Sequence, residues 1–143
     1  MALPQPLERD IVLYDRDCGF CRWSLARLLD LDLRRRLRPV ALQDPQADEL
    51  LRDMSAHERF ASAHLVTSDG RIHSGGHAVA PLLRVLPAGM PLSLVARLVP
   101  GLIGLGYGWV VRNRGLLGRG LSQESKDRAT RRIDRHAPAS WAA

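Results

Sequence analysis

The 143-residue sequence is poor in aromatic residues and in cysteine, and each shortage excludes a class of protein. Aromatic residues make up only 5% of the chain, so a buried core has to be built from aliphatic side chains. Two cysteines are too few for a disulfide-rich scaffold. Hydrophobic residues at 45% and charged residues at 25% are close to the averages of globular domains, which excludes wholesale disorder and a polytopic membrane protein. The length suits a single domain.

The first ten residues lack the apolar stretch of a secretory signal. They contain two prolines and several charges where such a signal requires an unbroken apolar segment. We therefore interpret residues 1–9 as a leader and expect a cytoplasmic protein. In that compartment, two cysteines three positions apart are typical of a catalytic dithiol or a metal site rather than of a permanent bridge.

The chain has a formal net charge of +6. Its basic residues are 20 arginines and a single lysine. Such a surplus usually indicates an anionic partner. However, the densest run, residues 34–38, follows a leucine-rich segment where a helix should end, and positive side chains stabilise that end of a helix. The second cluster, residues 126–135, is interspersed with acids, and no aromatic residues alternate with its arginines to stack on bases. We expect no nucleic-acid partner and interpret residues 119–143 as a basic, partly mobile tail.

The hydrophobic pattern alternates between strand and helix. Residues 11–14 form a continuous apolar run typical of a strand that is covered on both faces and paired in parallel. The two cysteines follow, and then leucines at helical spacing, so the cysteines fall at a strand-to-helix junction. A second strand is expected at residues 40–42 and a helix at residues 47–54.

The central part of the sequence predicts a β-hairpin followed by a helix. Asp69-Gly70 lies between Leu65-Val66-Thr67 and Arg71-Ile72-His73, and Asp-Gly between apolar residues is among the better short signals for a hairpin. The next apolar face, residues 78–86, accommodates Pro81 if that residue lies in the first helical turn. This order of elements indicates an α/β domain with a mixed sheet: a strand, a helix, a second strand, a second helix, a hairpin and a further helix.

Residues 92–111 are mostly apolar and long enough on paper to cross a bilayer. Arg97 lies within this stretch and Pro100-Gly101 divides it, so two short helices, residues 92–99 and about 102–117, fit better than one span. We expect the pair to pack on the sheet or cap its edge, without membrane association.

Cys18 and Cys21 are the candidate reactive residues. The start of a helix carries unsatisfied N–H groups and a partial positive charge, which stabilise a thiolate over a thiol. Cys18 is therefore the expected nucleophile, and Cys21, on nearly the same helical face, can attack a mixed disulfide on Cys18. Arg16 and Arg22 would lower the pKa of Cys18 further, while neighbouring acids would oppose them.

Other residues around the dithiol each have two interpretations. Asp15 either accepts the proton that Cys21 loses during resolution or caps the turn after the strand. Asp17 is interpreted as the N-cap of the helix. Phe20 and Trp23 either pack in the interior or form a hydrophobic docking surface.

A zinc site is the main alternative use of the two cysteines, because histidines could supply the remaining ligands. The histidines lack the second close-spaced ligand pair of a structural zinc site, so we expect no metal and no cofactor. Two inert buried thiols are a further alternative. The histidines in question are His57, His64, His73 and His77.

The segment from Tyr14 to Cys21 resembles the DCC family of thiol-disulfide oxidoreductases, named for its Asp-x-x-Cys-x-x-Cys signature. Asp15, Cys18 and Cys21 match that signature one for one. The resemblance extends over roughly residues 10–118 and includes Leu42-Gln43, the Asp69-Gly70 hairpin, and residues 107–118 with their Arg-Asn-Arg.

This resemblance implies a thioredoxin-like three-layer α/β sandwich over residues 10–118, with a helical C-terminal extension from about residue 92. The implied activity is thiol-disulfide exchange with a protein or a low-molecular-weight thiol, with Cys18, Cys21 and Asp15 as catalytic residues. The chain departs from expectation at Arg16, where the family usually has glycine. It also has no proline at residues 61–63, where thioredoxins place a cis-proline. The alternative function is a non-catalytic redox-sensing or membrane-associated interaction module.

Overall fold

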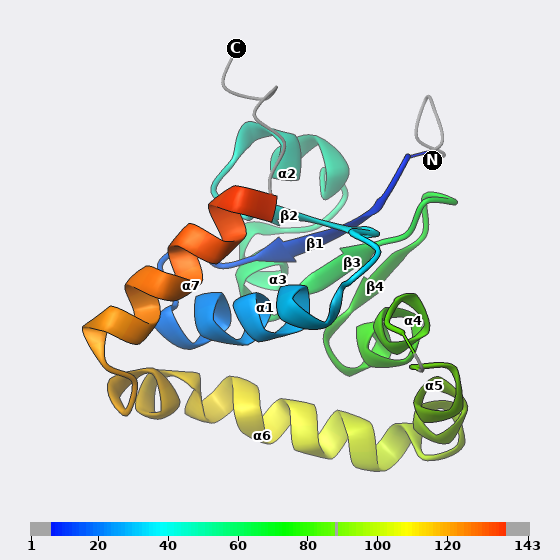
Figure 1. Ribbon diagram of the computed structural model, residues 1–143. Coiled ribbons are helices and arrows are strands. Elements are labelled where there is room, and N and C mark those ends of the chain that lie inside the picture. Colours follow the sequence, from blue (N-terminus) through cyan, green and yellow to red (C-terminus); the bar gives the residue numbers. More distant parts are fainter. Residues whose placement is uncertain (1–6, 88, 137–143) are drawn as a thin grey trace.

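The computed structural model describes residues 7–87 and 89–136, and a four-stranded mixed sheet lies at its centre (Figure 1). The strand order is β2-β1-β3-β4. β1 pairs in parallel with β2 and antiparallel with β3, and β3 pairs antiparallel with β4. The predicted mixed α/β sheet, its parallel first pair and its hairpin are therefore confirmed. The strands are β1 (Asp10–Tyr14), β2 (Leu37–Ala41), β3 (His64–Val66) and β4 (Ile72–Ser74).

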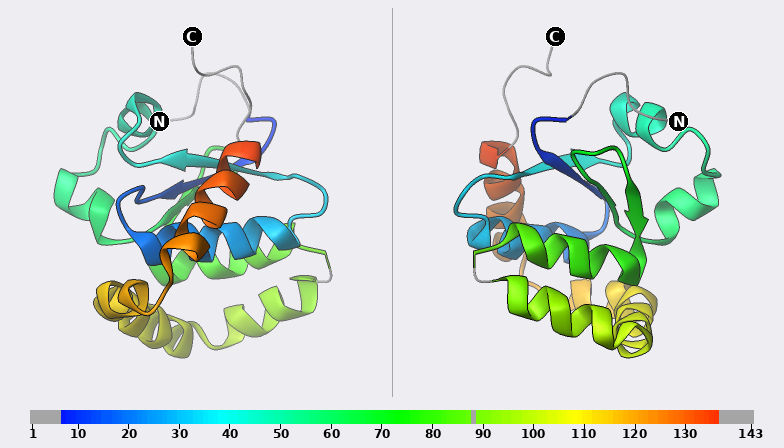
Figure 2. Two further views of the ribbon diagram at one scale, coloured as in Figure 1. Left: turned by 60° about the vertical axis from the view of Figure 1, so that its left-hand side comes forward. Right: turned by 90° about the vertical axis from the view of Figure 1, so that its right-hand side faces the viewer.

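Helices cover both faces of this sheet, as in a thioredoxin-like fold (Figure 2). Helices α1, α4 and α7 cover one face, and α2 covers the other. Helices α5 and α6 form a further layer beyond α1 and α4, which is the predicted C-terminal extension. The helices are α1 (Gly19–Leu31), α2 (Pro45–Leu50), α3 (Ala56–Ala61), α4 (Val79–Val85), α5 (Gly89–Leu98), α6 (Pro100–Arg119) and α7 (Gln123–His136), with a 3₁₀ helix η1 (Gly75–Ala78) before α4.

Strand β1 explains why the sequence shows a continuous apolar run. Its side chains alternate between two hydrophobic clusters: Val12 and Tyr14 face α1 and α4, whereas Ile11 and Leu13 face α2. Because helices cover the sheet on both sides, the side chains on both faces of β1 are apolar. The sequence therefore lacks the alternation of apolar and polar residues that marks a strand with one exposed face. β1 is thus fixed in the interior, and its carboxyl end delivers the chain to the cysteines.

Residues 92–111 divide into two helices, as predicted. Within the described ranges no single helix is long and apolar enough to cross a bilayer, and α5 and α6, which qualify only together, are bent by 99°. The expectation that this pair packs on the sheet or caps its edge is wrong. α5 packs on α4, while α6 packs on α1 and η1, so no element among residues 7–87 and 89–136 covers the opposite side of the two helices.

The expected basic tail begins with an ordered helix. α7 packs along α1 through Ala129 and Ile133. Arg132 anchors it by donating 2.7 Å to the Asp30 carboxylate and 2.8 Å to the Leu29 carbonyl. The hydrophobic pattern missed this helix because most of its other positions are charged or polar. Residues 1–6 and 137–143 of the expected leader and tail lie outside the described residues.

Candidate active site at the start of helix α1

Cys18 and Cys21 form a disulfide at the amino end of α1, with their Cα atoms 5.2 Å apart. Cys18 is the residue that caps the helix: its backbone is extended, and its Sγ atom accepts a hydrogen bond of 3.2 Å from the Cys21 N–H. Cys21 lies in the first turn. The Cys18 sulfur therefore faces backbone N–H groups that stabilise negative charge.

The predicted N-cap role of Asp17 is wrong, because Cys18 holds that position. Asp17 lies one residue too early in the turn and is exposed. Its backbone N–H donates 3.0 Å to the Asp15 carboxylate, and its own carboxylate accepts a 3.3 Å bond from the Gln43 side chain. Asp17 therefore belongs to the loop that leads into the helix.

Asp15 follows directly after β1 and holds this loop together. Its carboxylate accepts 2.8 Å from the Gln43 amide and 3.0 Å from the Asp17 N–H, and its carbonyl accepts 3.3 Å from the Cys18 N–H. Asp15 is also among the residues that line the same cavity as Cys21. Gln43 had no predicted role; the available signal was its place just after β2, whose carboxyl end lies beside that of β1.

The two arginines expected to lower the pKa of Cys18 are engaged elsewhere. The Arg16 guanidinium pairs with Asp44, which raises the pKa of Arg16. Arg22 donates 3.0 Å to the Thr130 hydroxyl of α7. The backbone N–H of Arg16 meanwhile donates 3.1 Å to the side-chain oxygen of Gln43. Through these bonds Arg16 holds the loop before α1, and Arg22 holds α1 to α7. None of these bonds is made to a sulfur atom.

An apolar cavity of about 350 Å³ lies beside Cys21, between α1, the sheet and α6. Burial beside this cavity raises the pKa of Tyr14 and of Tyr107. Phe20 lines the cavity and stacks on Trp23 with ring centroids 6.0 Å apart. The lining residues are Val12, Tyr14, Asp15, Phe20, Cys21, Ser24, Leu25, Leu28, Ser62, Ala63, Leu82, Tyr107, Val110, Val111 and Arg114.

Helix α6 covers the loop that precedes β3, where thioredoxins place a cis-proline. This chain has Ala61-Ser62-Ala63 there, and no cis peptide bond occurs in the described ranges. The Ala63 N–H donates 2.9 Å to the Tyr107 hydroxyl, and Arg114 donates 3.2 Å to the Phe60 carbonyl. Tyr107 and Arg114 had no predicted role, although both lie in the segment that carries the family resemblance.

A second, basic cleft of about 510 Å³ lies on the Cys18 side of the disulfide. It forms where the end of α6 and the start of α7 meet α1; a Cβ atom at Gly19 would lie only 3.0 Å from Cε of Lys126. Four cations and one acid line it. The lining residues are Asp17, Cys18, Gly19, Val111, Arg112, Arg114, Gly115, Gly118, Arg119 and Lys126.

The histidines considered as zinc ligands do not gather around the cysteines. His64 is buried in β3, where its ring contacts the Ser74 hydroxyl at 2.7 Å and the Arg59 carbonyl at 2.9 Å. His57 lies in α3, His73 in β4 and His77 in η1. Among residues 7–87 and 89–136, no group of three or more His, Cys, Asp or Glu side chains is placed to hold a metal ion.

A two-cysteine redox pair at the first helix of a mixed α/β sheet defines a thioredoxin-like dithiol-disulfide domain. Comparison with protein families then identifies which one: residues 12–119 match the DCC1-like thiol-disulfide oxidoreductase family, and the chain belongs to it. Comparisons with curated proteins and with solved structures give no match. Family and cysteine pair together support a thiol-disulfide redox role.

Proposed function

We propose that this protein is an enzyme that exchanges the Cys18–Cys21 dithiol and disulfide with a thiol or disulfide substrate. The observation that carries the proposal is the position of the Cys18 sulfur as the cap of α1, with Cys21 one turn away and bonded to it. Helix N–H groups lower the pKa of such a thiol and make the thiolate available at neutral pH.

In the reducing direction, the Cys18 thiolate attacks one sulfur of the substrate disulfide, which releases one substrate thiolate and forms a mixed disulfide. The Cys21 thiolate then attacks the Cys18 sulfur, forms the intramolecular disulfide and releases the second substrate thiolate. Two electrons thus pass from the dithiol to the substrate. The reverse sequence oxidises a substrate dithiol.

Asp15 is proposed as the group that takes the proton from Cys21 before resolution. Supporting this role, Asp15 lines the same apolar cavity as Cys21, and its carboxylate is held by Gln43 and by the Asp17 N–H. An apolar cavity offers few other acceptors, so a fixed carboxylate there favours loss of the thiol proton.

The surroundings of the disulfide favour a small, anionic substrate. The Ala63 N–H, which lies on the backbone edge before β3, is already bonded to Tyr107, so an extended peptide lacks that donor. The cleft on the Cys18 side is lined by Arg112, Arg114, Arg119 and Lys126. Such a cluster attracts carboxylates, as in a low-molecular-weight thiol with two acidic groups.

The activity is tested by titrating the dithiol against reduced and oxidised glutathione and following the Cys18–Cys21 bond by thiol labelling. We expect a reversible two-electron transition, and Cys21→Ser should accumulate a mixed disulfide at Cys18. A disulfide that forms reversibly but exchanges with added substrates no faster than free cysteine would instead favour a sensor. Failure of Cys21→Ser to trap any partner would contradict the assigned roles.

The substrate class is tested by comparing oxidised glutathione, which carries net negative charge, with the cationic disulfide cystamine. Arg119→Gln should slow exchange with glutathione by roughly fivefold without slowing exchange with cystamine, because one cation close to an anion contributes about 1 kcal/mol. Arg131→Gln on α7 is the matched control, since Arg131 is exposed and does not line the cleft. Equal rates for the two disulfides in the wild-type protein would refute the anionic preference.

A further inference from the structure

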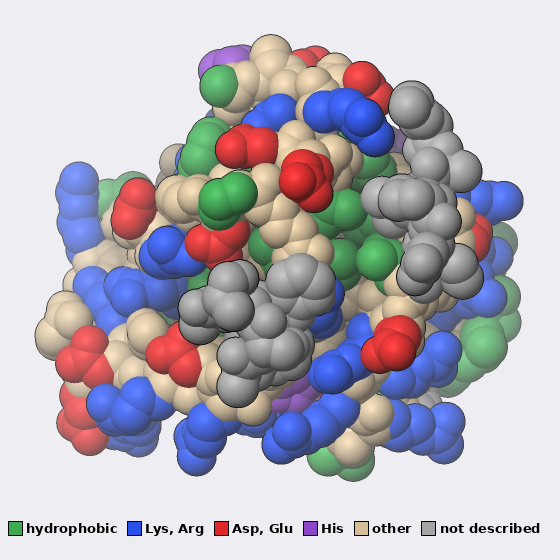
Figure 3. All heavy atoms as spheres, turned by 90° about the horizontal axis from the view of Figure 1, so that it is seen from above, with side chains coloured by type: hydrophobic (Ala, Val, Ile, Leu, Met, Phe, Trp, Pro, Cys, Tyr) green, Lys and Arg blue, Asp and Glu red, His purple; other side chains and the backbone are tan. Residues whose placement is uncertain are grey.

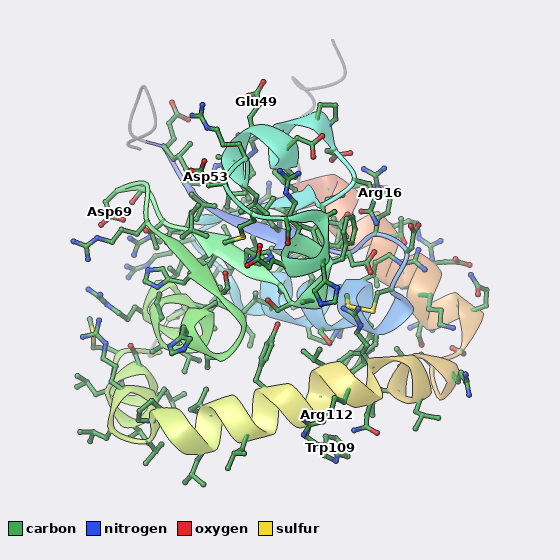
Figure 4. All side chains as sticks on the ribbon, turned by 180° about the vertical axis from the view of Figure 1, so that it is seen from behind. Arg16, Glu49, Asp53, Asp69, Trp109 and Arg112 are labelled. Atoms are coloured by element: carbon green, nitrogen blue, oxygen red, sulfur yellow. A yellow bond between two sulfur atoms is a disulfide. The ribbon has the colours of Figure 1, made fainter. Side chains whose placement is uncertain are left out.

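Helices α5 and α6 present an apolar surface that no other described element covers. On α6, Leu102, Leu105, Trp109 and Leu116 recur at intervals of three, four and seven residues, which places them along one stripe. Leu102 and Leu105 are 68% and 70% exposed. Figure 4 shows Trp109 on the side of α6 that faces away from the sheet.

Helix α5 extends the same surface. It buries Gly89, Ser93 and Ala96 and leaves its larger side chains in solvent. Together the two helices form what we call the α5–α6 face, a bent pair that lies along the lower side of the molecule in Figure 1. Exposed large apolar side chains that gather on two consecutive helices of a folded domain indicate an interaction site. Its members are Met90, Leu92, Leu94, Val95, Leu98, Leu102, Leu105, Trp109 and Leu116, all more than half exposed.

The charged side chains of α5 and α6 themselves are all of one sign. Between Asp69 and Glu124 the sequence contains six arginines and no aspartate or glutamate. By helical position, Arg112 and Arg119 lie along one edge of the α6 stripe, and Arg97 lies on α5. On the opposite side of the molecule, seen from above in Figure 3, acidic and basic side chains lie next to each other. The partner of the α5–α6 face therefore combines an apolar region with negative charge.

A second copy of the chain does not meet that requirement. A twofold interface places the same patch on both sides, so the second copy would supply apolar side chains and arginines but no negative charge. The pair also does not form one straight span across the bilayer, since α5 and α6 are bent by 99°. An anionic lipid surface meets both requirements: leucines and a tryptophan enter the boundary of the acyl chains while arginines reach the headgroups.

Contrary to the expectation from the sequence that this helix pair has no membrane association, we infer that the α5–α6 face docks this domain on the surface of anionic membranes, with both helices in the plane of the interface. This inference does not depend on the redox chemistry proposed above. Arg112 and Arg119 lie between the apolar stripe and the cleft beside Cys18, so docking would hold that cleft at the edge of the lipid surface.

The test is flotation of the full chain with vesicles of phosphatidylcholine alone or mixed with phosphatidylglycerol. We expect binding to the mixed vesicles that is at least tenfold stronger than to phosphatidylcholine and that weakens with added salt. Leu102→Ser with Leu105→Ser should reduce binding at least tenfold. In a variant with Trp23→Phe and Trp141→Phe, the emission of Trp109 should shift to shorter wavelength when the anionic vesicles are added.

The matched control is Leu31→Ser with Leu33→Ser, because these leucines are 58% and 78% exposed at the end of α1, away from the face. The control should bind vesicles like the wild-type protein. Exchange with a small disulfide in the absence of lipid should be unchanged in the Leu102/Leu105 variant, which separates this proposal from the redox proposal. Absence of flotation, equal binding to neutral vesicles, or a dimer that only the Leu102/Leu105 substitutions dissociate would each overturn the inference.

Discussion

The backbone N–H of Cys21 donates a 3.2 Å hydrogen bond to the Sγ atom of Cys18, so the first turn of α1 is closed by sulfur instead of oxygen. A side chain that caps a helix receives N–H groups and the positive end of the helix dipole. In the reduced protein this arrangement favours the thiolate of Cys18 over its thiol. The arrangement does not stabilise the thiolate of Cys21 in the same way, because Cys21 lies inside the helix and does not cap it.

The first prediction concerns the acidity of Cys18. We expect its pKa in the reduced protein to lie below the free-thiol value of about 8.5, because the helix start stabilises the charged form. The rate of alkylation by iodoacetamide, measured against pH in Cys21→Ser, gives this pKa directly. Cys18→Ser provides the comparison for Cys21. A midpoint for Cys18 at or above about 8.5 would remove the case for an activated nucleophile.

The second prediction separates a catalytic from a structural role of Asp15. An asparagine at this position can still accept hydrogen bonds from Gln43 and from the Asp17 N–H, so Asp15→Asn keeps the loop while removing the negative charge. We expect resolution by Cys21 to slow by about 100-fold and the initial attack by Cys18 to change little. Stopped-flow measurement of the two phases tests this.

Asp17→Asn is the control for Asp15→Asn. It removes an exposed carboxylate from the same loop that does not line the cavity beside Cys21. Resolution by Cys21 should stay close to the wild-type rate, and only the attack by Cys18, whose cleft Asp17 lines, is free to change. If Asp15→Asn slows attack and resolution equally, Asp15 acts by holding the loop, which is the other interpretation of its position in the sequence.

The third prediction concerns the contact between Tyr107 and Ala63. Tyr107→Phe removes the hydroxyl that accepts from the Ala63 N–H and leaves the ring in the apolar cavity. We expect the free energy of unfolding to fall by about 1 kcal/mol, measured by urea denaturation of the oxidised protein. Hydrogen exchange at the Ala63 amide should accelerate at the same time. Unchanged exchange at that amide would show that α6 does not hold the loop before β3.

The sequence predicts the elements that have a regular apolar pattern and misses those that do not. The run at residues 11–14 identifies β1 because its first three positions are buried and Tyr14 is partly buried, and Asp69-Gly70 locates the hairpin because Gly70 takes a φ of +82°. Helix α7 was missed because polar contacts, such as that between Arg132 and Asp30, hold much of its inner side. The short α3, which buries no side chain fully, leaves no hydrophobic signal.

The same distinction applies to the candidate site. The position of Cys18 and Cys21 at a strand-to-helix junction follows from local pattern, and the structure confirms it. The cap could not be assigned, because only the backbone geometry decides between Asp17 and Cys18. The contributions of Gln43 and Tyr107 arise from contacts across 28 and 44 residues, which no local pattern records.

The fourth prediction follows from His64, which is 2% exposed. Its Nε2 lies 2.9 Å from the Arg59 carbonyl, which can only accept, so that nitrogen carries the proton and Nδ1 accepts from the Ser74 hydroxyl. Burial lowers the pKa of His64, although its bond to the Arg59 carbonyl opposes this. Burial also lowers the pKa of His136, although its bond to Asp32 opposes the change.

For both histidines the folded state binds a proton only at lower pH than the unfolded chain, whose histidines titrate near pH 6.5. As pH falls through that value, the unfolded state takes up protons first, so the free energy of unfolding decreases. We expect urea denaturation to show lower stability at about pH 5.5 than at about pH 7.5, with a smaller difference in His64→Gln. His57→Gln, which changes an exposed histidine, should retain the wild-type difference. A His64 ring that titrates at or above about pH 6.5 by NMR would contradict the prediction, because protonation would then stabilise the fold or leave it unchanged.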